Sequence, residues 1–153
     1  MAVLDRTEWH CGQTAVNVLM VGIAEGGMAY PVAWSVLDHG GGSGAGEHTE
    51  LLDRFLRLIK PDELRALVAD REPVGSDFLK ALDQREILFV IWLKKDRRIG
   101  PSSGEWSLPV KMFARDCQPE QSTHLPALKG LGGAESVECP VTTRRFKDDS
   151  FMI

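Results

Sequence analysis

The hydrophobic pattern of this chain changes its period at a glycine-rich run, residues 40–46 (GGGSGAG). Before this run, β-branched and aliphatic residues fill three strand-like segments, residues 2–5, 14–23 and 28–37. After it, apolar residues recur at helical spacing, and one face of the predicted helix comprises Leu51, Leu52, Phe55, Leu58 and Ile59. Three consecutive strands followed by a helix indicate a sheet on which helices pack.

The alternation of strands and helices continues to about residue 95. Residues 64–69 form a predicted strand, and residues 87–93 form a continuous apolar strand. Between them, Ser76 is a plausible N-cap for a helix whose apolar stripe comprises Phe78, Leu79 and Leu82. The order β-β-β-α-β-α-β predicts an α/β fold with a mixed sheet and flanking helices.

Two of the predicted strands carry positional signals. Residues 14–23 are apolar on both faces, which is typical of a covered central strand. Pro31 lacks a backbone N–H, so residues 28–37 are expected to form an edge strand or to contain a bulge. Four tryptophans are divided between environments: Trp9, Trp34 and Trp92 are expected in the core, and Trp106 is expected to be exposed.

Residues 99–153 have a different character from residues 1–98, and we predict a domain boundary between them. This second region is rich in proline and glycine, and it contains short possible strands near residues 107–113, 136–141 and 150–153. It is therefore expected to be a β-rich extension of the mixed-sheet domain.

Composition excludes several protein classes. The chain has 153 residues, of which 43% are apolar and 26% charged, values typical of a globular protein and unlike a disordered chain or a collagen. The longest apolar run, residues 87–93, is too short to span a membrane, and acidic and basic residues near the start argue against a signal peptide. Three scattered cysteines predict reduced thiols and a cytoplasmic location. The net charge of −4 gives no global indication of a nucleic-acid partner, so any charged site is expected to be local.

Two acidic residues directly follow predicted strands: Asp5 closes the first strand, and Asp70 closes the fourth. A carboxylate at the end of a buried strand is costly unless a partner compensates it. If the two strands are parallel neighbours, the carboxylates meet at one edge of the sheet, where a divalent cation relieves their repulsion. Mg²⁺ favours such sites, and two-metal sites act on phosphodiesters. The alternative is that each aspartate caps a turn or pairs with Arg6 or Arg71, and spacing alone favours this plainer role.

Other candidate sites are weaker. A basic cluster that suits contact with DNA phosphates follows the strand at 87–93, although such clusters more often mark a solvated strand end; it comprises Lys94, Lys95, Arg97 and Arg98. The histidines and cysteines lack zinc-ligand spacing. The glycine run lacks the lysine and hydroxyl residue of a phosphate-binding loop.

Four segments carry more specific motifs: residues 4–9 (LDRTEW), 30–34 (YPVAW), 69–75 (ADREPVG) and 89–94 (FVIWLK). The first, with Gly12 and residues 17–19 (NVL), resembles the first catalytic block of bacterial insertion-sequence DDE transposases. The third is similar to the second catalytic block of the subgroup related to insertion-sequence type 4, which has Asp-Arg-Glu, an aromatic residue and then glycine. The other two segments resemble the parts that accompany these blocks, so that the resemblance covers roughly residues 1–98.

The resemblance implies an RNase H-like core in which the first and fourth strands are adjacent. It also implies Mg²⁺ or Mn²⁺ as cofactor, DNA transposon ends and a transposase homodimer as partners, and phosphodiester cleavage with strand transfer as the activity. Asp5 and Asp70 match the first two metal ligands of the family's catalytic triad. Residues 99–153 look more loosely like the β-strand insertion that these transposases carry.

The chain also departs from the family pattern. The third ligand is a glutamate in a Tyr-Arg-Glu-Lys-type block beyond the β insertion, and no such block follows here. Pro73 stands where the family has an aromatic residue, and Gly42 where asparagine is common. Glu72, two residues past Asp70, is a candidate replacement ligand, although a salt bridge or a place at the mouth of the site is the more ordinary role for it.

These departures lead to two functional hypotheses. The first is a catalytic-core fragment of a DDE transposase that is inactive alone, so that enzymatic activity stays open. The alternative is a non-catalytic remnant that at most binds DNA or a full-length transposase.

Overall fold

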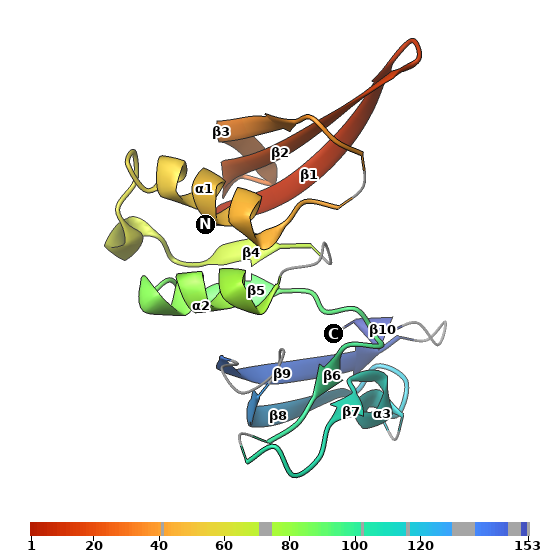
Figure 1. Cartoon of the computed structure of the whole chain (residues 1–153). Coiled ribbons are helices and arrows are strands. Elements are labelled where there is room, and N and C mark those ends of the chain that lie inside the picture. The colour runs from red at the N-terminus through yellow and green to blue at the C-terminus, as the bar shows by residue number, and fades with distance from the viewer. Residues whose placement is uncertain are drawn as a thin grey trace. The chain divides into compact units, whose positions relative to one another are not determined.

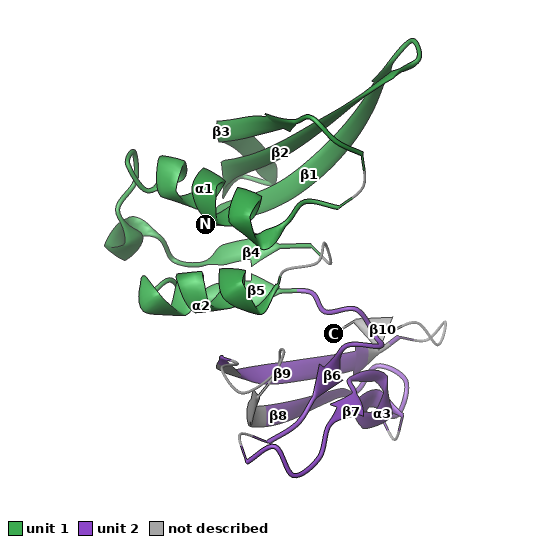
Figure 2. Cartoon of the chain, in the orientation of Figure 1, with its two compact units in different colours: residues 1–91 green, residues 92–153 purple. Residues whose placement is uncertain are grey.

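The computed structural model describes residues 1–40, 42–70, 75–101, 103–115, 117–129, 137–146 and 151–152. The chain divides into two compact units, Met1–Ile91 (unit 1) and Trp92–Ile153 (unit 2), shown in Figure 2. The sequence placed the boundary between residues 98 and 99. The basic segment that follows the last strand of unit 1 therefore belongs to unit 2.

Unit 1 contains a five-stranded mixed sheet, as the element order predicts (Figure 1). The strand order is β3-β2-β1-β4-β5. The first three strands in sequence pair antiparallel, whereas β4 pairs parallel with both β1 and β5. The strands are β1 (Ala2–Cys11), β2 (Thr14–Glu25), β3 (Met28–Leu37), β4 (Leu67–Ala69) and β5 (Phe89–Ile91).

Two helices, α1 (Ala45–Phe55) and α2 (Ser76–Gln84), contact each other and cover one face of this sheet (Figure 1). Alternate strand residues point to opposite faces, and the alternation is clearest in β2, which buries Asn17, Leu19 and Val21 on the helix side. This packing forms the core of unit 1, which includes Leu4, Leu19, Val21, Leu67, Leu51, Leu52, Phe55, Phe78, Leu79 and Leu82.

The opposite face of the sheet is much more open, which corrects two predictions. Trp34 and Val36 pair with Met20 and Val18 of β2 on that face, and both are more than half exposed. Strand β2 is therefore covered on one face, and its buried residues alternate with half-buried ones. The prediction that Trp9, Trp34 and Trp92 lie in the core is wrong, because they are 68%, 55% and 43% exposed. Trp106 is exposed as expected.

The prediction for Pro31 is confirmed. Strand β3 lies at the edge of the sheet, and its register with β2 shifts between Val21 and Gly22, where Gly22 pairs with Pro31. The shift brings backbones close together, since a Cβ atom on Gly22 would lie 2.5 Å from the carbonyl oxygen of Tyr30. Glycine is thus required at this point of β2 by lack of space.

Several element boundaries differ from the predicted ones. Helix α1 begins at Ala45, six residues before the first predicted apolar position, because Gly44 caps it and Glu47 bonds back to the cap. It ends before Leu58, which is exposed. Helix α2 has Gly75 at its N-cap, and the predicted cap, Ser76, is its first helical residue. The segment predicted as a strand at 64–69 pairs as a strand only from Leu67 and follows a 3₁₀ turn, η1 (Pro61–Glu63).

Unit 2 contains β structure, as predicted, but its strands have other bounds than the predicted segments. Its sheets have the orders β10-β9-β8 and β6-β7, and Ile99, Val110 and Val141 form its small core. Strand β8 was not predicted; its register shifts between Leu125 and Leu128, around Pro126. The elements of unit 2 are β6 (Arg98–Ile99), β7 (Leu108–Pro109), α3 (Lys111–Ala114), β8 (Ser122–Lys129), β9 (Glu138–Arg145) and β10 (Phe151–Met152).

In the part of the chain that the structure describes, no helix is long and apolar enough to cross a membrane. Cys11, Cys117 and Cys139 are all free thiols.

Candidate functional site

The two predicted site residues stand at the same level of adjacent strands. Strands β1 and β4 are parallel neighbours, and their last paired residues are Leu4 and Ala69. Asp5 and Asp70 each follow this pair directly in the sequence. The expected juxtaposition of the two strands is therefore present in the structure.

The environment of the two aspartates differs from the expected one in two respects. Asp5 does not end its strand, because β1 continues to Cys11 and pairs there with β2 across the turn at Gly12. Neither aspartate is buried, since both are exposed at this edge of the sheet. The desolvation cost that made them conspicuous in the sequence therefore does not arise, and water reaches both carboxylates.

A small pocket lies at the step where β4 ends at Ala69 while β1 continues. It brings together two acidic residues, one cation, one histidine and an apolar floor: Asp5, Asp70, Arg6, His48, Leu4, Leu19 and Ala69. Strand β1 supplies Leu4, Asp5 and Arg6, and helix α1 supplies His48. The pocket thus combines groups that attract a cation with a group that attracts an anion.

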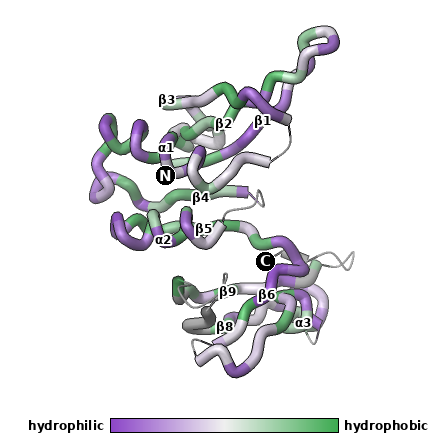
Figure 3. Tube along the Cα trace, in the orientation of Figure 1, coloured by the Kyte–Doolittle hydropathy of each residue, from purple (hydrophilic) through white to green (hydrophobic). Residues whose placement is uncertain are grey.

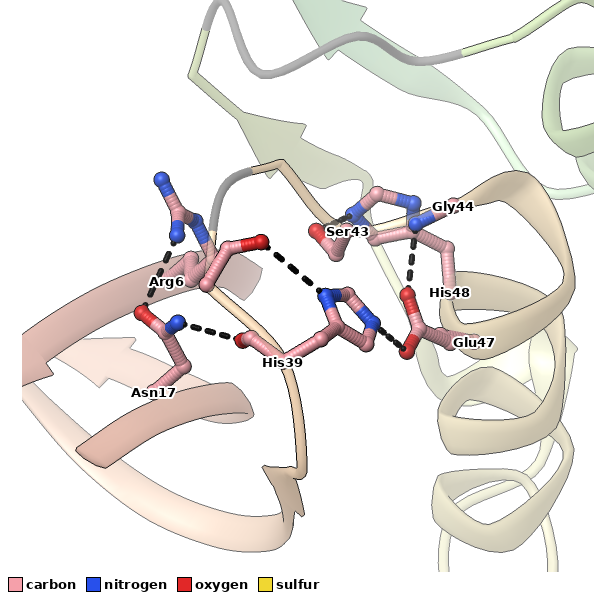
Figure 4. Close-up of polar contacts among 8 residues, drawn as sticks. Arg6, Asn17, His39, Ser43, Gly44, Glu47 and His48 are labelled. Carbon is pink, nitrogen blue, oxygen red and sulfur yellow. Dashed lines mark hydrogen bonds and ion pairs between the residues drawn. The ribbon is translucent and has the colours of Figure 1, made fainter. Parts of the chain in front are cut away.

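Arg6 takes part in a chain of hydrogen bonds with Asn17 and His39 (Figure 4). Arg6 Nη1 donates to Oδ1 of Asn17 at 3.1 Å, and Asn17 Nδ2 donates to the carbonyl oxygen of His39 at 2.7 Å. Asn17 is 1% exposed, so both ends of its amide find partners within the core of unit 1. Glu8 Oε2 lies 4.0 Å from the same Nη1 of Arg6.

The loop after β3 is fastened to the start of α1 by Glu47 (Figure 4). Glu47 Oε2 accepts a hydrogen bond from the Gly44 N–H at 2.6 Å, and Oε1 lies 2.8 Å from Nε2 of His39. The hydrogen bond to Glu47 raises the pKa of His39 above its ordinary value. The hydrogen bond from the Gly44 N–H lowers the pKa of Glu47 most, and the hydrogen bond with His39 lowers it further.

A second, buried pair lies beside this loop. Ser43 Oγ and His48 Nε2 are 3.0 Å apart, and both residues are almost completely buried. The ring of His48 also contacts the ring of Phe78 from α2, with 5.3 Å between their centres. The pair thereby fixes the loop and both helices at the rim of the pocket.

The structure describes only some of the remaining predicted site residues. Arg71, Glu72 and Pro73 fall outside the described residues. The basic cluster lies at the start of unit 2, where the chain turns from hydrophobic to hydrophilic (Figure 3). Lys94 and Lys95 are exposed there, whereas Arg98 donates hydrogen bonds to the backbone and the hydroxyl of Ser107.

Carboxylate oxygens are the kind of donor that a hydrated magnesium or manganese ion takes. Among the described residues, no group of three or more His, Cys, Asp or Glu side chains is placed to hold a metal ion. Asp5 and Asp70 offer two carboxylates open to water, and Mg²⁺ is commonly held by one or two carboxylates with water and phosphate oxygens as its other ligands. This oxygen-only set is unlike the nitrogen and sulfur ligands of structural zinc.

The sequence reasoning missed Asn17, Ser43 and His48. Asn17 offered a signal, because it is the single amide within an otherwise apolar strand, and a buried amide there needs specific partners. Ser43 and His48 gave no comparable signal, since one lies in a glycine run and the other in a polar helical turn.

Comparisons with protein-family models, with curated proteins and with solved structures found no match to this chain.

Proposed function

We propose that this chain is the catalytic-core portion of a DDE transposase, in which Asp5 and Asp70 bind Mg²⁺ or Mn²⁺ for cleavage and strand transfer of DNA. The proposal includes the fold family, so that the mixed sheet would be an RNase H-like sheet. The observation that carries it is the parallel pairing of β1 with β4, with Leu4 opposite Ala69. This register puts the two motif aspartates at one level of the sheet.

The sequence motifs support the same conclusion independently. Asp5 lies in the segment that resembles the family's first catalytic block, and Asp70 lies in the segment that resembles the second. These blocks lie 65 residues apart in sequence, yet the strand order brings them together. Adjacent first and fourth strands are what the resemblance implies.

The roles of the chain's own residues follow from their positions. Asp5 and Asp70 supply carboxylate oxygens from two strands whose pairing fixes the spacing of their backbones. Their exposure admits water or a terminal 3′-hydroxyl to the same place. A bound divalent cation supplies charge stabilisation for the attacking and leaving oxygens of a phosphodiester.

Two carboxylates are one fewer than the triad that the resemblance implies. Members of a catalytic set act as a unit, and removal of one commonly costs several orders of magnitude in rate. We therefore expect this chain alone to give no nicking of transposon-end DNA above the buffer control. A nick that disappears in Asp70→Ala would contradict this expectation and would indicate another carboxylate of the chain as third ligand.

Titration calorimetry with Mn²⁺ tests the proposed metal site. The wild-type chain is expected to bind Mn²⁺ weakly, and Asp5→Asn and Asp70→Asn are each expected to abolish the binding heat, because each removes a charged ligand while keeping the side-chain shape. Asp62→Asn, an exposed aspartate in the 3₁₀ turn of the same unit, is the matched control and should bind as the wild type does.

Unchanged binding in both site variants would refute the assignment. It would favour the alternative, a non-catalytic chain that at most binds DNA or a full-length transposase.

A further inference from the structure

The hairpin of β1 and β2 extends past the end of β4 in unit 1 (Figure 1). Strand β4 pairs with β1 only over Ala2–Leu4, whereas β1 continues to Cys11. In the part of the chain that the structure describes, no strand pairs with residues 5–11 on that side of β1. A row of unpaired backbone groups of this kind is a template for a further strand.

The backbone hydrogen bonds of β1 show which of its residues face this free edge. The Ala2 N–H donates to the carbonyl oxygen of Ala66, directly before β4, at 2.9 Å. Backbone groups alternate in direction along a strand, and the register of β1 with β2 has no shift. The N–H and C=O groups of Glu8 and His10 therefore point out from the free edge, as those of Ala2 point toward β4.

The side chains along the free edge are complementary to a second copy of themselves. Trp9 is 68% exposed, and its Nε1 donates to Oγ1 of Thr7 at 2.8 Å. On the other face of the strand, Oε1 of Glu8 lies 3.7 Å from Nε2 of His10, and both side chains are exposed. A two-fold axis at Trp9 would place Glu8 of each copy opposite His10 of the other.

We propose that residues 7–11 of β1 pair antiparallel with the same residues of a second copy of this chain, with the two Trp9 side chains opposite each other. The Trp9 pair is then of the non-hydrogen-bonded kind, in which side chains approach most closely. The two pairs of Glu8 with His10 exchange backbone hydrogen bonds. Aromatic pairs and pairs of opposite charge both stabilise adjacent strands.

Two neighbouring registers fit this edge less well. A two-fold axis at Glu8 would place the two glutamates opposite each other, and like charges there are destabilising. An axis at Thr7 would place His10 of one copy opposite Leu4 of the other, where β4 already pairs through Ala69. The axis at Trp9 avoids both conflicts and leaves Asp5 outside the paired segment.

The shortness of the paired segment predicts weak association. Pairing of residues 7–11 buries far less than the ~1,200–2,000 Å² of a stable interface, so monomer and dimer should exchange rapidly. A covalent trap is therefore the suitable test. The inference involves no metal ion and does not depend on the proposed function.

Disulfide trapping in the full chain tests the register. With the axis at Trp9, Thr7 of one copy lies opposite Cys11 of the other, which is an exposed thiol. The Cα atoms of such a pair lie about 4.5 Å apart, a separation that a disulfide can span. In a glutathione redox buffer, Thr7→Cys is expected to form covalent dimers about tenfold faster than the wild type. Peptide mass spectrometry identifies the link between positions 7 and 11.

Met28→Cys is the matched control for random collision, because Met28 is 59% exposed and lies on β3, away from this edge. Equal rates for Thr7→Cys and Met28→Cys would overturn the proposal. A wild-type chain that forms the Cys11–Cys11 link as fast as Thr7→Cys forms its own would overturn the register. In the proposed pairing, the two Cys11 residues lie roughly 13 Å apart.

Sedimentation equilibrium of charge variants tests the pairs of Glu8 with His10. His10→Glu places like charges opposite each other twice and is expected to weaken dimerisation about tenfold. Glu8→Lys combined with His10→Glu restores opposite charges and should restore dimerisation. Met28→Glu changes the net charge by the same amount and should dimerise as the wild type does.

Equal weakening in Met28→Glu and His10→Glu would overturn the proposal, because it would reduce the effect to net charge. A double variant that dimerises no better than His10→Glu would overturn it too, as would a wild-type chain that stays monomeric up to about millimolar concentration.

Discussion

Unit 1 and unit 2 differ in the size of their hydrophobic cores. In unit 1, strands of ten and twelve residues and two amphipathic helices bury a continuous set of side chains around Phe55, Leu82 and Leu67. In unit 2, the described core reduces to Ile99, Val110 and Val141, with Leu93, Phe113 and Leu125 packed against them. The helices and the long strands of unit 1 thus form a larger core beneath the strands that carry Asp5 and Asp70, whereas the described core of unit 2 is small and separate.

The difference predicts a large stability effect in unit 1. Phe55→Ala removes a completely buried ring from α1 and leaves a cavity, so we expect the free energy of unfolding of unit 1 to fall by about 3–5 kcal/mol. Hydrogen exchange of the unit 1 amides, measured at increasing urea concentrations, gives this loss in the free energy of unfolding. If the amides of unit 2 lost protection equally, the two units would unfold as one, and the comparison between them would fail.

A smaller deletion in the core of unit 2 is expected to lower the free energy of unfolding by less. Ile99→Val removes one methylene from its core, for an expected loss of about 0.5–1.5 kcal/mol. Because the core of unit 2 is small, this loss should appear in the amides of β6 and β9. A loss confined to unit 1 would contradict the division of the chain.

An intermediate effect is expected at the β2–β3 bulge. Gly22→Ala places a methyl group against the Tyr30 backbone, and such overpacking costs about 1–3 kcal/mol. Gly46→Ala is the control, because its Cβ meets nothing within 4 Å and helix α1 favours alanine over glycine. Thermal unfolding should show a lower midpoint for Gly22→Ala and an equal or higher one for Gly46→Ala. Equal midpoints for Gly22→Ala and the wild type would show that the backbones separate freely.

The smallest effect is expected at the exposed His39–Glu47 pair, and it depends on pH. The raised pKa of His39 makes its contribution complete below the ordinary value of about 6.5, and the contribution is lost as pH rises through the higher folded-state value. The lowered pKa of Glu47 makes its contribution complete above about 4.5, and it is lost as pH falls further. The difference in unfolding midpoint between wild type and His39→Gln should therefore be largest between these two values.

A matched histidine in unit 2 sharpens this test. His124 lies 3.0 Å from the hydroxyl of Thr142 and not from a carboxylate, so His124→Gln should leave the pH dependence of unit 1 unchanged. A midpoint difference for His39→Gln that stays constant from acidic to alkaline pH would contradict the charged pair.

The sequence was most informative where elements are long and periodic. The apolar spacing of residues 51–59 located α1, and Pro31 located the edge strand and its bulge. Asp5 and Asp70 were identifiable because each follows an apolar segment that predicts a strand, and the strand order brings the two together although β1 continues past Asp5. These features depend on local pattern and on the few ways in which strands and helices connect.

What the sequence did not reveal depends on tertiary packing. Trp34 is apolar but exposed, because both helices of unit 1 pack on the other face of its sheet. Asn17 gains its role only when Arg6 of β1 and the His39 carbonyl, in the loop after β3, approach it. Helix α1 extends back to Ala45 because the Glu47 side chain bonds to Gly44, a contact that outweighs the weak helical preference of glycine.

Paramagnetic broadening by Mn²⁺ tests the central claim, that Asp5 and Asp70 form one cation site, most directly. With substoichiometric Mn²⁺, the backbone amide signals nearest the ion lose intensity first. The account predicts that the amides around Asp5 and Asp70 broaden together in the wild-type chain and that neither set broadens in Asp5→Asn. Broadening centred instead on the acidic groove between α1 and α2, at Glu50, Asp53 and Asp77, would contradict it.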